Sequence, residues 1–569
     1  MGKAFKKRVI LLLILFVATF LRLWKLEAVP VSLFSDELDV GYQAYSIIHT
    51  GKDYFGNPWP VHFQSFADTR TPLYIYASVP TVSAFGITAW GVRLPAAFFG
   101  ILGVWAIYLL AKQIFNDEKT AIIASGVLAL SPWHIQYSRA GFEVTMLLTF
   151  LLFGLYFFFR SLGNGKWLWL STTFLVSCLW IYSTAKLFVP LLLVALFFLF
   201  RKQIVKMGRV NLFKTVLAGL IVGVPIVLST FLGGGGLRFG YLSVFTDPTT
   251  HTEVSYSRLT DAAVEGASRN IFEKADSWFI HNKYTQWTAR IVENYFKSYS
   301  TEFLFLKGDL NLRHSVEGVG QFYKVEVFAL IFGLISLAVF FKDKKLKALI
   351  FFWLTIGVLP SAITRDGGAH ATRLILILPP LIFLISYGLT RGVGIFSPGL
   401  RRLALSGYMA LFIFNFWSYQ HSFWVHNPWY SERSWHAGYK EVVELVKKYE
   451  SGFEKIIISN ADQPPSIFFA SYYPVPPEKW QEGLDEDHVQ GFGNTSHLGK
   501  YYFGQVGEEG LLGLGEIIEE GTLYIAAQRE IEGNLLESPQ KVPKGLKLID
   551  KVIYPSGEPA FWAFAKDTK

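Results

Sequence analysis

Long apolar runs alternate with short polar segments over most of the chain. The runs lie near residues 9–24, 93–111, 121–135, 144–160, 167–183, 186–200, 215–232, 323–341, 347–363, 372–389 and 403–420. Most approach the roughly 20 residues that a helix needs to cross the hydrocarbon core of a bilayer. The pattern therefore predicts a polytopic α-helical membrane protein with about 11 transmembrane helices. The first run is long for a signal peptide and lacks a small-residue cleavage site, so we expect it to be a retained span.

The charged residues are few and unevenly distributed. Only 17% of the residues are charged, against about a quarter in soluble domains. The net charge is +9, but residues 421–569 hold 14 Lys and Arg against 22 Asp and Glu, a net −8. The basic excess lies in short loops between apolar runs, as the positive-inside rule expects. The basic character thus reports membrane topology and gives no reason to expect a nucleic-acid partner.

Charge also sets the predicted orientation. With a cytoplasmic N-terminus, the Lys- and Arg-rich loops all fall on the cytoplasmic side. The loops 25–92 and 233–322 and the C-terminal region then lie outside. We therefore predict a multi-pass protein of the cell membrane whose polar chemistry is extracytoplasmic.

The pattern changes after residue 420. The segment "YKEVVELVKKYE" has helical periodicity, while "EKIIISN", "SIFFASYY", "TLYIAAQ" and "AFWAFAK" are short and strand-like. This predicts two domains: residues 1–420, a transmembrane catalytic domain, and residues 421–569, a soluble extracytoplasmic α/β domain.

The middle of the loop 233–322 is expected to be helical. Its large aromatic residues, Trp278, Phe279, Trp287 and Phe296, suggest either amphipathic helices at the membrane interface or ordinary packing against the spans.

Acids, arginines and histidines gather in five segments on the predicted outer face. The segments are "SDELD" with Asp36 and Glu37, "DTRTPL" with Asp68 and Arg70, "YSRAGFE" with Arg139 and Glu143, "KGDLNLRH" with Asp309, Arg313 and His314, and "GGAHATR" with His370 and Arg373. Each has a plain structural alternative, such as a helix cap, a structural ion pair or a snorkelling arginine. Together they favour a shared polar cavity beside the bilayer, suited to a phosphate-bearing lipid that arginine can bind in bidentate fashion.

This chemistry fits transfer of a sugar from a lipid phosphate. A carboxylate can accept the proton of an acceptor hydroxyl, and cations can stabilise a departing phosphate. The reaction would invert the anomeric carbon and would need no nucleotide-binding fold. The alternative is a transporter or flippase of a lipid-linked or anionic solute, although no internal repeat is evident.

Several motifs resemble those of the GT-C superfamily of membrane glycosyltransferases. "SDE" after the first span, the Pro-Leu-Tyr segment, "VRLPAAFFG", "YSRAGFE", "GDLNLRHS" and "GGAHATRLILILP" resemble the protein O-mannosyltransferases and the lipid A aminoarabinose transferases. The resemblance implies a GT-C fold and a polyprenyl-phosphate-linked donor.

The resemblance also suggests roles for the polar residues. It implies Asp36 as the catalytic base, with Glu37 beside it. Donor-phosphate contacts would come from Arg70, Arg139, His370 and Arg373, and further substrate contacts from Asp68, Glu143, Asp309, Arg313 and His314.

Three points stay open at this stage. The sequence does not identify the sugar, and the acceptor can be a protein, a lipid or a glycan. We predict no tightly bound metal or other cofactor, although Asp36, Glu37 and His370 are residue types that could hold a divalent cation.

Overall fold

The chain forms two compact units in a computed structural model that describes residues 3–66, 69–266, 271–507 and 510–567. The first unit comprises residues 1–24, 61–74 and 95–423, and the second comprises 25–60, 75–94 and 424–569. The predicted change at residue 420 thus lies close to the last boundary between units. Two parts of the segment predicted as an external loop also belong to the second unit.

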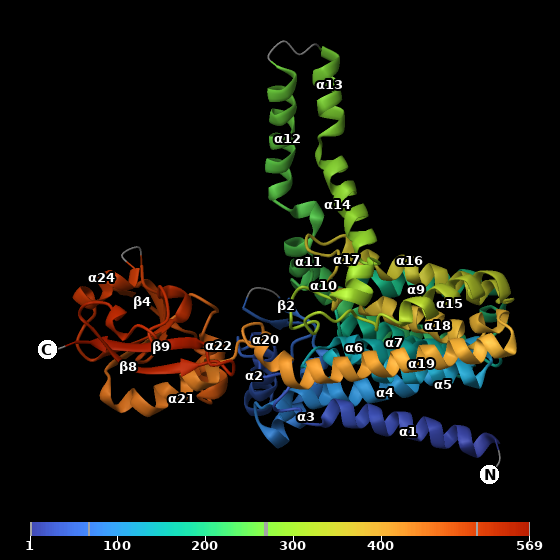
Figure 1. Cartoon of the computed structure of the whole chain (residues 1–569), viewed down its shortest axis with the longest axis horizontal. Helices are drawn as coiled ribbons and strands as arrows, with labels where there is room; N and C mark the ends of the chain where they lie inside the picture. Colours follow the sequence, from blue (N-terminus) through green and yellow to red (C-terminus); the bar gives the residue numbers. More distant parts are fainter. Residues whose placement is uncertain (1–2, 67–68, 267–270, 508–509, 568–569) are drawn as a thin grey trace. The chain divides into compact units, whose positions relative to one another are not determined.

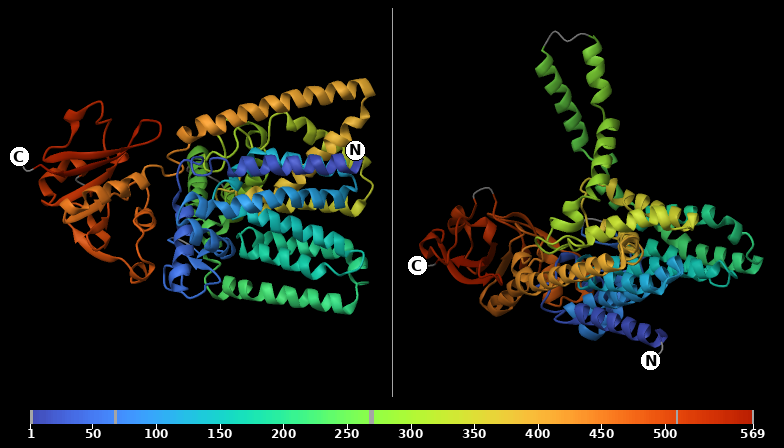
Figure 2. Two further views of the ribbon diagram at one scale, coloured as in Figure 1. Left: turned by 90° about the horizontal axis from the view of Figure 1, so that it is seen from below. Right: turned by 45° about the vertical axis from the view of Figure 1, so that its right-hand side comes forward.

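The first unit is a bundle of apolar helices whose axes run roughly parallel (Figure 1, Figure 2). Its long elements are α1 (Lys3–Leu23), α4 (Ala89–Phe115, of which residues 95–115 belong to this unit), α5 (Glu118–Leu130), α7 (Val144–Ser161), α8 (Leu168–Ser177), α9 (Ala185–Ile204), α10 (Arg209–Leu232), α15 (Glu326–Phe340), α16 (Lys344–Gly357), α18 (Leu378–Thr390) and α19 (Pro398–His421). Every predicted apolar run coincides with one of these helices. The predicted helical membrane architecture is therefore confirmed.

The number of spans is less firmly fixed than the architecture. Among the described residues, six helical segments are long and apolar enough to cross a membrane: 89–115, 144–161, 185–204, 209–232, 344–362 and 373–395. Shorter apolar helices at 73–85, 168–180 and 326–340 accompany them. The count of 11 stays a prediction.

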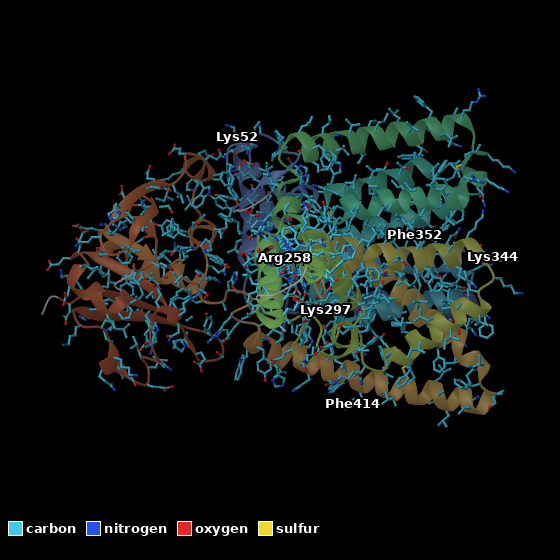
Figure 3. All side chains as sticks on the ribbon, turned by 90° about the horizontal axis from the view of Figure 1, so that it is seen from above. Lys52, Arg258, Lys297, Lys344, Phe352 and Phe414 are labelled. Carbon is cyan, nitrogen blue, oxygen red and sulfur yellow. The ribbon has the colours of Figure 1, made fainter. Side chains whose placement is uncertain are left out.

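Inner and outer helices of the bundle differ in the way a bilayer requires. Helix α18 is buried along almost its whole length, whereas α10 and α19 expose many apolar side chains. Phe414 on α19, for example, is 69% exposed and points away from the bundle (Figure 3). Such wide apolar surfaces are stable when lipid, not water, covers them.

Small residues let α15 and α18 approach closely. A Cβ atom added to Gly333 would lie 2.0 Å from the carbonyl oxygen of Leu384, and one added to Gly388 would lie 2.1 Å from that of Ala329. Side chains at either position would push the helices apart, as expected for the small-residue contacts of membrane helices.

The loop 233–322 contains the predicted helices. These are α12 (Thr249–Glu265), α13 (Ile271–Ile280) and α14 (Lys283–Lys297). Asn294 of α14 is buried and donates to the carbonyls of Ala362 and Thr364 at 3.1 and 2.8 Å. Phe272 and Phe279 of α13 are each 80% exposed, which agrees with a place at the membrane interface better than with packing against the spans.

The second unit contains a mixed β-sheet, which confirms the predicted α/β character of the C-terminal region. Its strands are β3 (Lys455–Ile458), β4 (Asp485–Val489), β5 (Gly493–Leu498), β6 (Tyr501–Phe503), β7 (Thr522–Ala527), β8 (Leu546–Ile553) and β9 (Pro559–Lys566), in the order β4-β5-β6-β3-β7-β9-β8. Strand β3 is parallel to β6 and β7, and the other pairs are antiparallel. The core of one face includes Ile457, Tyr524, Trp562 and Phe564.

One predicted strand is wrong. The segment "SIFFASYY" forms helix α22 (Ser466–Tyr472), which follows Pro465 and buries Phe468 and Phe469. A short apolar run has no clear period, so sequence alone does not separate a buried strand from a buried helix. Proline just before the first turn favours the helix, since its fixed φ suits a helix start.

The second unit also includes helix α2 (Ser35–Thr50), which packs against α22 and α23 (Pro477–Gln481). The Tyr42 hydroxyl donates to the Val475 carbonyl at 2.9 Å, and Gln481 donates to Ser46 and Thr50. These bonds tie the "SDELD" segment, which begins α2, to the C-terminal region.

Candidate functional site

The first unit holds a largely apolar cavity of about 450 Å³ with a few polar groups. Its lining is Tyr182, Ser183, Thr184, Lys186, Leu187, Thr230, Phe231, Gly235, Gly236, Phe239, Leu242, Pro360, Ile363, Thr364 and Arg373. We call it the apolar cavity. It combines hydrocarbon surface with two fixed cations, Lys186 and Arg373.

Lys186 is held beside His62. Its Nζ lies 3.0 Å from His62 Nε2 and donates to the Gly235 carbonyl at 3.2 Å, while His62 Nδ1 lies 2.7 Å from Ser229 Oγ. Burial and the charge of Lys186 lower the pKa of His62 to about 4. The imidazole is therefore neutral near pH 7, and Lys186 carries the charge.

Arg373 begins the turn η4 (Arg373–Ile377) and is buried. Its Nη1 donates to Thr364 Oγ1 at 2.7 Å and to Asp366 Oδ1 at 2.6 Å. Burial alone would raise the pKa of the Asp366 carboxyl, but the hydrogen bond and charge of Arg373 outweigh it and lower that pKa. Asp366 thus fixes the guanidinium at the cavity.

Asp309, His314 and His370 form a second cluster in this unit. One ligand atom from each residue lies within 4.8 Å of those of the other two. His314 Nδ1 lies 3.0 Å from the Tyr137 hydroxyl and 3.2 Å from Thr372 Oγ1. This set of a carboxylate and two imidazoles is the one in the first unit that could hold a metal ion among the described residues searched.

The same cluster is linked electrostatically to Arg313 and Arg373. Burial raises the pKa of Asp309, although the backbone hydrogen bonds from Ala371 and Asn311 and the charge of Arg373 act in the opposite direction. Burial, His370, Arg313 and Arg373 together lower the pKa of His314. The structure therefore brings together five predicted site residues from two segments, 309–314 and 370–373.

Arg139 and Glu143 lie around a turn and not on one helix. Arg139 ends α6 (Pro132–Ser138), and Glu143 immediately precedes α7. Four residues apart, they would share a face of a continuous helix, but the helix is interrupted at "AGF" and they do not. Arg139 is fully buried, donates to the Leu21 carbonyl at 2.8 Å and lies over the Phe423 ring, whereas Glu143 is half-buried.

The predicted pair in the "DTRTPL" segment is only partly described. Arg70 is half-buried in β2 (Thr69–Arg70), which pairs with β1 (Phe63–Gln64), and its Nε lies 3.5 Å from Ser65 Oγ. Asp68 lies outside the described residues.

Asp36 and Glu37 belong to the second unit, in the first turn of α2. Glu37 is fully buried and accepts two hydrogen bonds from Arg93, at 2.7 Å from Nε and 2.8 Å from Nη2. Arg93 also donates to the Leu26 and Pro30 carbonyls. Asp36, one residue earlier, is half-buried.

A polar cavity of about 540 Å³ lies within the second unit. Its lining is Glu27, Val31, Ser32, Leu33, Ile87, Thr88, Ala89, Arg93, Ala437, Gly438, Lys440, Glu441, Tyr472, Ile553, Tyr554 and Pro555. We call it the polar cavity. Burial raises the pKa of Tyr472, so its phenol stays neutral and can donate and accept hydrogen bonds.

Sequence reasoning missed Lys186, Asp366 and the two cavities. Lys186 lies in "YSTAKLF", between two apolar runs that nearly abut. A charged residue between two membrane spans was the one sign in the sequence that Lys186 is a candidate site residue. Arg93 lies in a motif that the resemblance uses, but its pairing with Glu37 joins segments 56 residues apart. No local pattern reveals such a contact.

Comparison with known proteins agrees with this architecture. Residues 69–229 match the family model described as dolichyl-phosphate-mannose-protein mannosyltransferase. Two proteins of Bacillus subtilis (strain 168), each named as a candidate mannosyltransferase, are similar to part of the chain. YkcB is 30% identical over 179 residues, 30% of this chain and 24% of YkcB, and YycA is 28% identical over 165 residues, 28% of this chain and 24% of YycA. The matched segment thus spans about a quarter of the length of each relative.

A solved structure extends the similarity over the whole chain. The crystal structure of ArnT from Cupriavidus metallidurans, bound to undecaprenyl phosphate, superposes with a TM-score of 0.52 at 12% identity, covering 99% of this chain and 98% of ArnT. At this identity the match concerns the fold. Together with the mannosyltransferase-like segment, it confirms the predicted resemblance to membrane glycosyltransferases of the GT-C superfamily.

Proposed function

We propose that this protein transfers a sugar from a polyprenyl-phosphate donor to an acceptor hydroxyl on the extracytoplasmic face, with inversion at the anomeric carbon. The observation that carries the proposal is the apolar cavity, in which Lys186 and Arg373 adjoin a wall of aliphatic and aromatic side chains. A polyprenyl phosphate has the matching composition, one anionic group on a hydrocarbon chain. ArnT, with the same fold, is described as binding undecaprenyl phosphate, which supports the assignment.

In the proposed reaction, the acceptor oxygen attacks the anomeric carbon and its proton goes to a carboxylate base, the role that the sequence resemblance suggests for Asp36. The bond between that carbon and the phosphate oxygen breaks, and its electron pair leaves with the polyprenyl phosphate. Lys186 and Arg373 stabilise the negative charge that develops on the leaving group. Among the two adjacent acids, Asp36 is the candidate base because the resemblance of the "SDE" motif gives it that role; both carboxylate oxygens of Glu37 accept hydrogen bonds from Arg93.

The polar cavity offers a place for the acceptor. Its acids, Glu27 and Glu441, and the hydroxyls of Tyr472 and Tyr554 can bind a hydroxyl-bearing molecule. This composition does not choose among protein, lipid and glycan. Comparing membrane lipids and envelope proteins of cells with and without the gene by mass spectrometry would identify the sugar and the acceptor together.

Substitution of Asp36 tests the proposed base. Asp36→Asn keeps the shape of the side chain but removes its basicity, so the transfer rate should fall about 10²- to 10⁴-fold, the usual contribution of general-base catalysis. Binding of the donor lipid should persist. Transfer would be measured with purified protein in proteoliposomes containing sugar-charged polyprenyl phosphate.

Glu444→Gln is the matched control, because Glu444 is an exposed acid of the same unit. Near-normal transfer by Asp36→Asn would exclude Asp36 as the base. Movement of the lipid-linked sugar across the bilayer without transfer would favour the transporter alternative.

A further inference from the structure

The cluster of Asp309, His314 and His370 has the composition of a transition-metal site. The residues come from two segments: the loop after η3 (Glu302–Leu306) and the turn that precedes η4. Two imidazoles and one carboxylate suit Zn²⁺ and similar ions better than Mg²⁺ or Ca²⁺, which prefer oxygen ligands throughout.

The spacing of the ligand atoms fits this use. Ligands at about 2.1 Å from a tetrahedral ion lie about 3.4 Å from one another. Here the three ligand atoms are all within 4.8 Å of one another. Side-chain rotations that move each atom by about 1 Å would close the set around an ion.

Neighbouring groups orient two of the three ligands. Asp309 accepts hydrogen bonds at 2.9 Å from the backbone N–H groups of Asn311 and Ala371, one on each carboxylate oxygen. His314 Nδ1 lies 3.0 Å from the Tyr137 hydroxyl and 3.2 Å from Thr372 Oγ1, which leaves Nε2 as the nitrogen available to an ion. Metal-binding histidines usually have such an outer partner on the second ring nitrogen.

Two arginines lie close to the ligands in the sequence: Arg313 directly precedes His314, and Arg373 follows His370 by three residues. Arg373 is paired with Asp366 at 2.6 Å, which reduces its repulsion of a bound ion.

We propose that Asp309, His314 and His370 bind one divalent transition-metal ion of the Zn²⁺ class. This departs from the sequence prediction that no metal is tightly bound. Three protein ligands leave a fourth position open, as in catalytic zinc sites. If the proposed function holds, an oxygen of the donor phosphate is the natural occupant of that position; this last clause rests on the proposed function, whereas metal binding itself does not.

Direct metal binding tests the proposal. Full-length protein in detergent, stripped with a chelator and titrated with ZnCl₂, should bind one ion per chain by calorimetry and elemental analysis. His314→Ala and His370→Ala should each weaken binding at least 100-fold. Tyr137→Phe, which removes an outer partner, should weaken it about 10-fold.

Two variants separate ligand loss from misfolding. His370→Cys keeps a metal-binding side chain and should retain Zn²⁺, and its Co²⁺ form should show the visible absorption of a thiolate ligand. His251→Ala removes an exposed histidine of α12 and should bind like the unchanged protein. Absence of Zn²⁺ binding by the unchanged protein, or equal loss in His251→Ala and His314→Ala, would overturn the proposal.

The outcomes remain distinct from those of the proposed function. Protein that binds Zn²⁺ through these residues but transfers no sugar would support the metal site and contradict the transferase. Protein that transfers sugar but binds no Zn²⁺ through these residues would support the transferase and contradict the metal site.

Discussion

The apolar and polar cavities differ in lining much more than in size. Their volumes are about 450 and about 540 Å³, but the first is largely apolar with two cations, whereas the lining of the second includes two acids, two cations and two tyrosines. Both contain a buried arginine that is paired with a carboxylate. Arg373 pairs with Asp366, whose side chain is 62% exposed, whereas Arg93 pairs with Glu37, which is fully buried.

This difference suits Arg93 to a structural role and Arg373 to the proposed role in binding a phosphate. Arg93 makes two bonds to Glu37 and others to backbone carbonyls, so its hydrogen-bonding capacity is largely used within the protein. Asp366 can turn toward water, and an incoming phosphate can then take its place at Arg373. On the proposed function, the same residue types stabilise the fold in one cavity and bind the donor phosphate in the other.

The largest expected effect is on stability, at the polar cavity. Glu37→Gln removes the charge opposite a buried guanidinium, and breaking one half of such a pair costs about 3–5 kcal/mol. Thermal unfolding in detergent should show a clearly lowered midpoint. Glu441→Gln changes an exposed acid of the same cavity and should stay within about 0.5 kcal/mol of the unchanged protein. Equal unfolding midpoints for Glu37→Gln and Glu441→Gln would contradict the structural role of the pair between Arg93 and Glu37.

At the apolar cavity the effect should be on binding. Arg373→Gln removes a charged hydrogen-bond donor worth about 1.5–3 kcal/mol, so polyprenyl phosphate should bind roughly 10- to 100-fold more weakly. Stability should change little, since Asp366 can be solvated. Arg365→Gln is the neighbouring control, because Arg365 faces Asp247 at 3.9 Å. If Arg373→Gln binds polyprenyl phosphate as tightly as the unchanged protein, Arg373 does not bind the donor phosphate.

A smaller effect is expected on the acceptor. Tyr472→Phe deletes one hydroxyl from the polar cavity and should raise the acceptor KM about 3- to 10-fold, the value of one neutral hydrogen bond. Donor affinity should not change. Steady-state kinetics with each substrate varied in turn would show the difference, and a change in donor KM alone would contradict the division of roles.

The smallest effect concerns pH. Because the pKa of His62 is about 4 in the folded protein and about 6.5 when unfolded, protonation favours unfolding. The stabilisation is present above pH 6.5 and is lost as the pH falls from there toward 4. His62 is half-buried, so we expect about 1 kcal/mol after allowing for solvent screening. His62→Gln should flatten the dependence of the unfolding midpoint on pH over this range, and an unchanged slope would contradict the assignment.

The sequence was informative where the physical signal is local. Apolar runs placed every long helix of the bundle, and the changed pattern after residue 420 revealed the sheet region. It was less informative where a short run has no period, as in α22, or where a turn interrupts a helix, as between Arg139 and Glu143. The predicted site residues between 309 and 373 do come together, but their hydrogen-bond partners were not predictable.

By itself, the sequence determined the membrane architecture and the residue types available for chemistry, because hydrophobic runs and charge distribution act over neighbouring residues. Only the tertiary structure decided the surroundings of each charge. Asp36 and Glu37 are adjacent in the chain, yet Glu37 is fully buried against Arg93 and Asp36 is half-buried. Contacts between residues far apart in sequence set that difference, since burial and pairing depend on which segments the fold brings together.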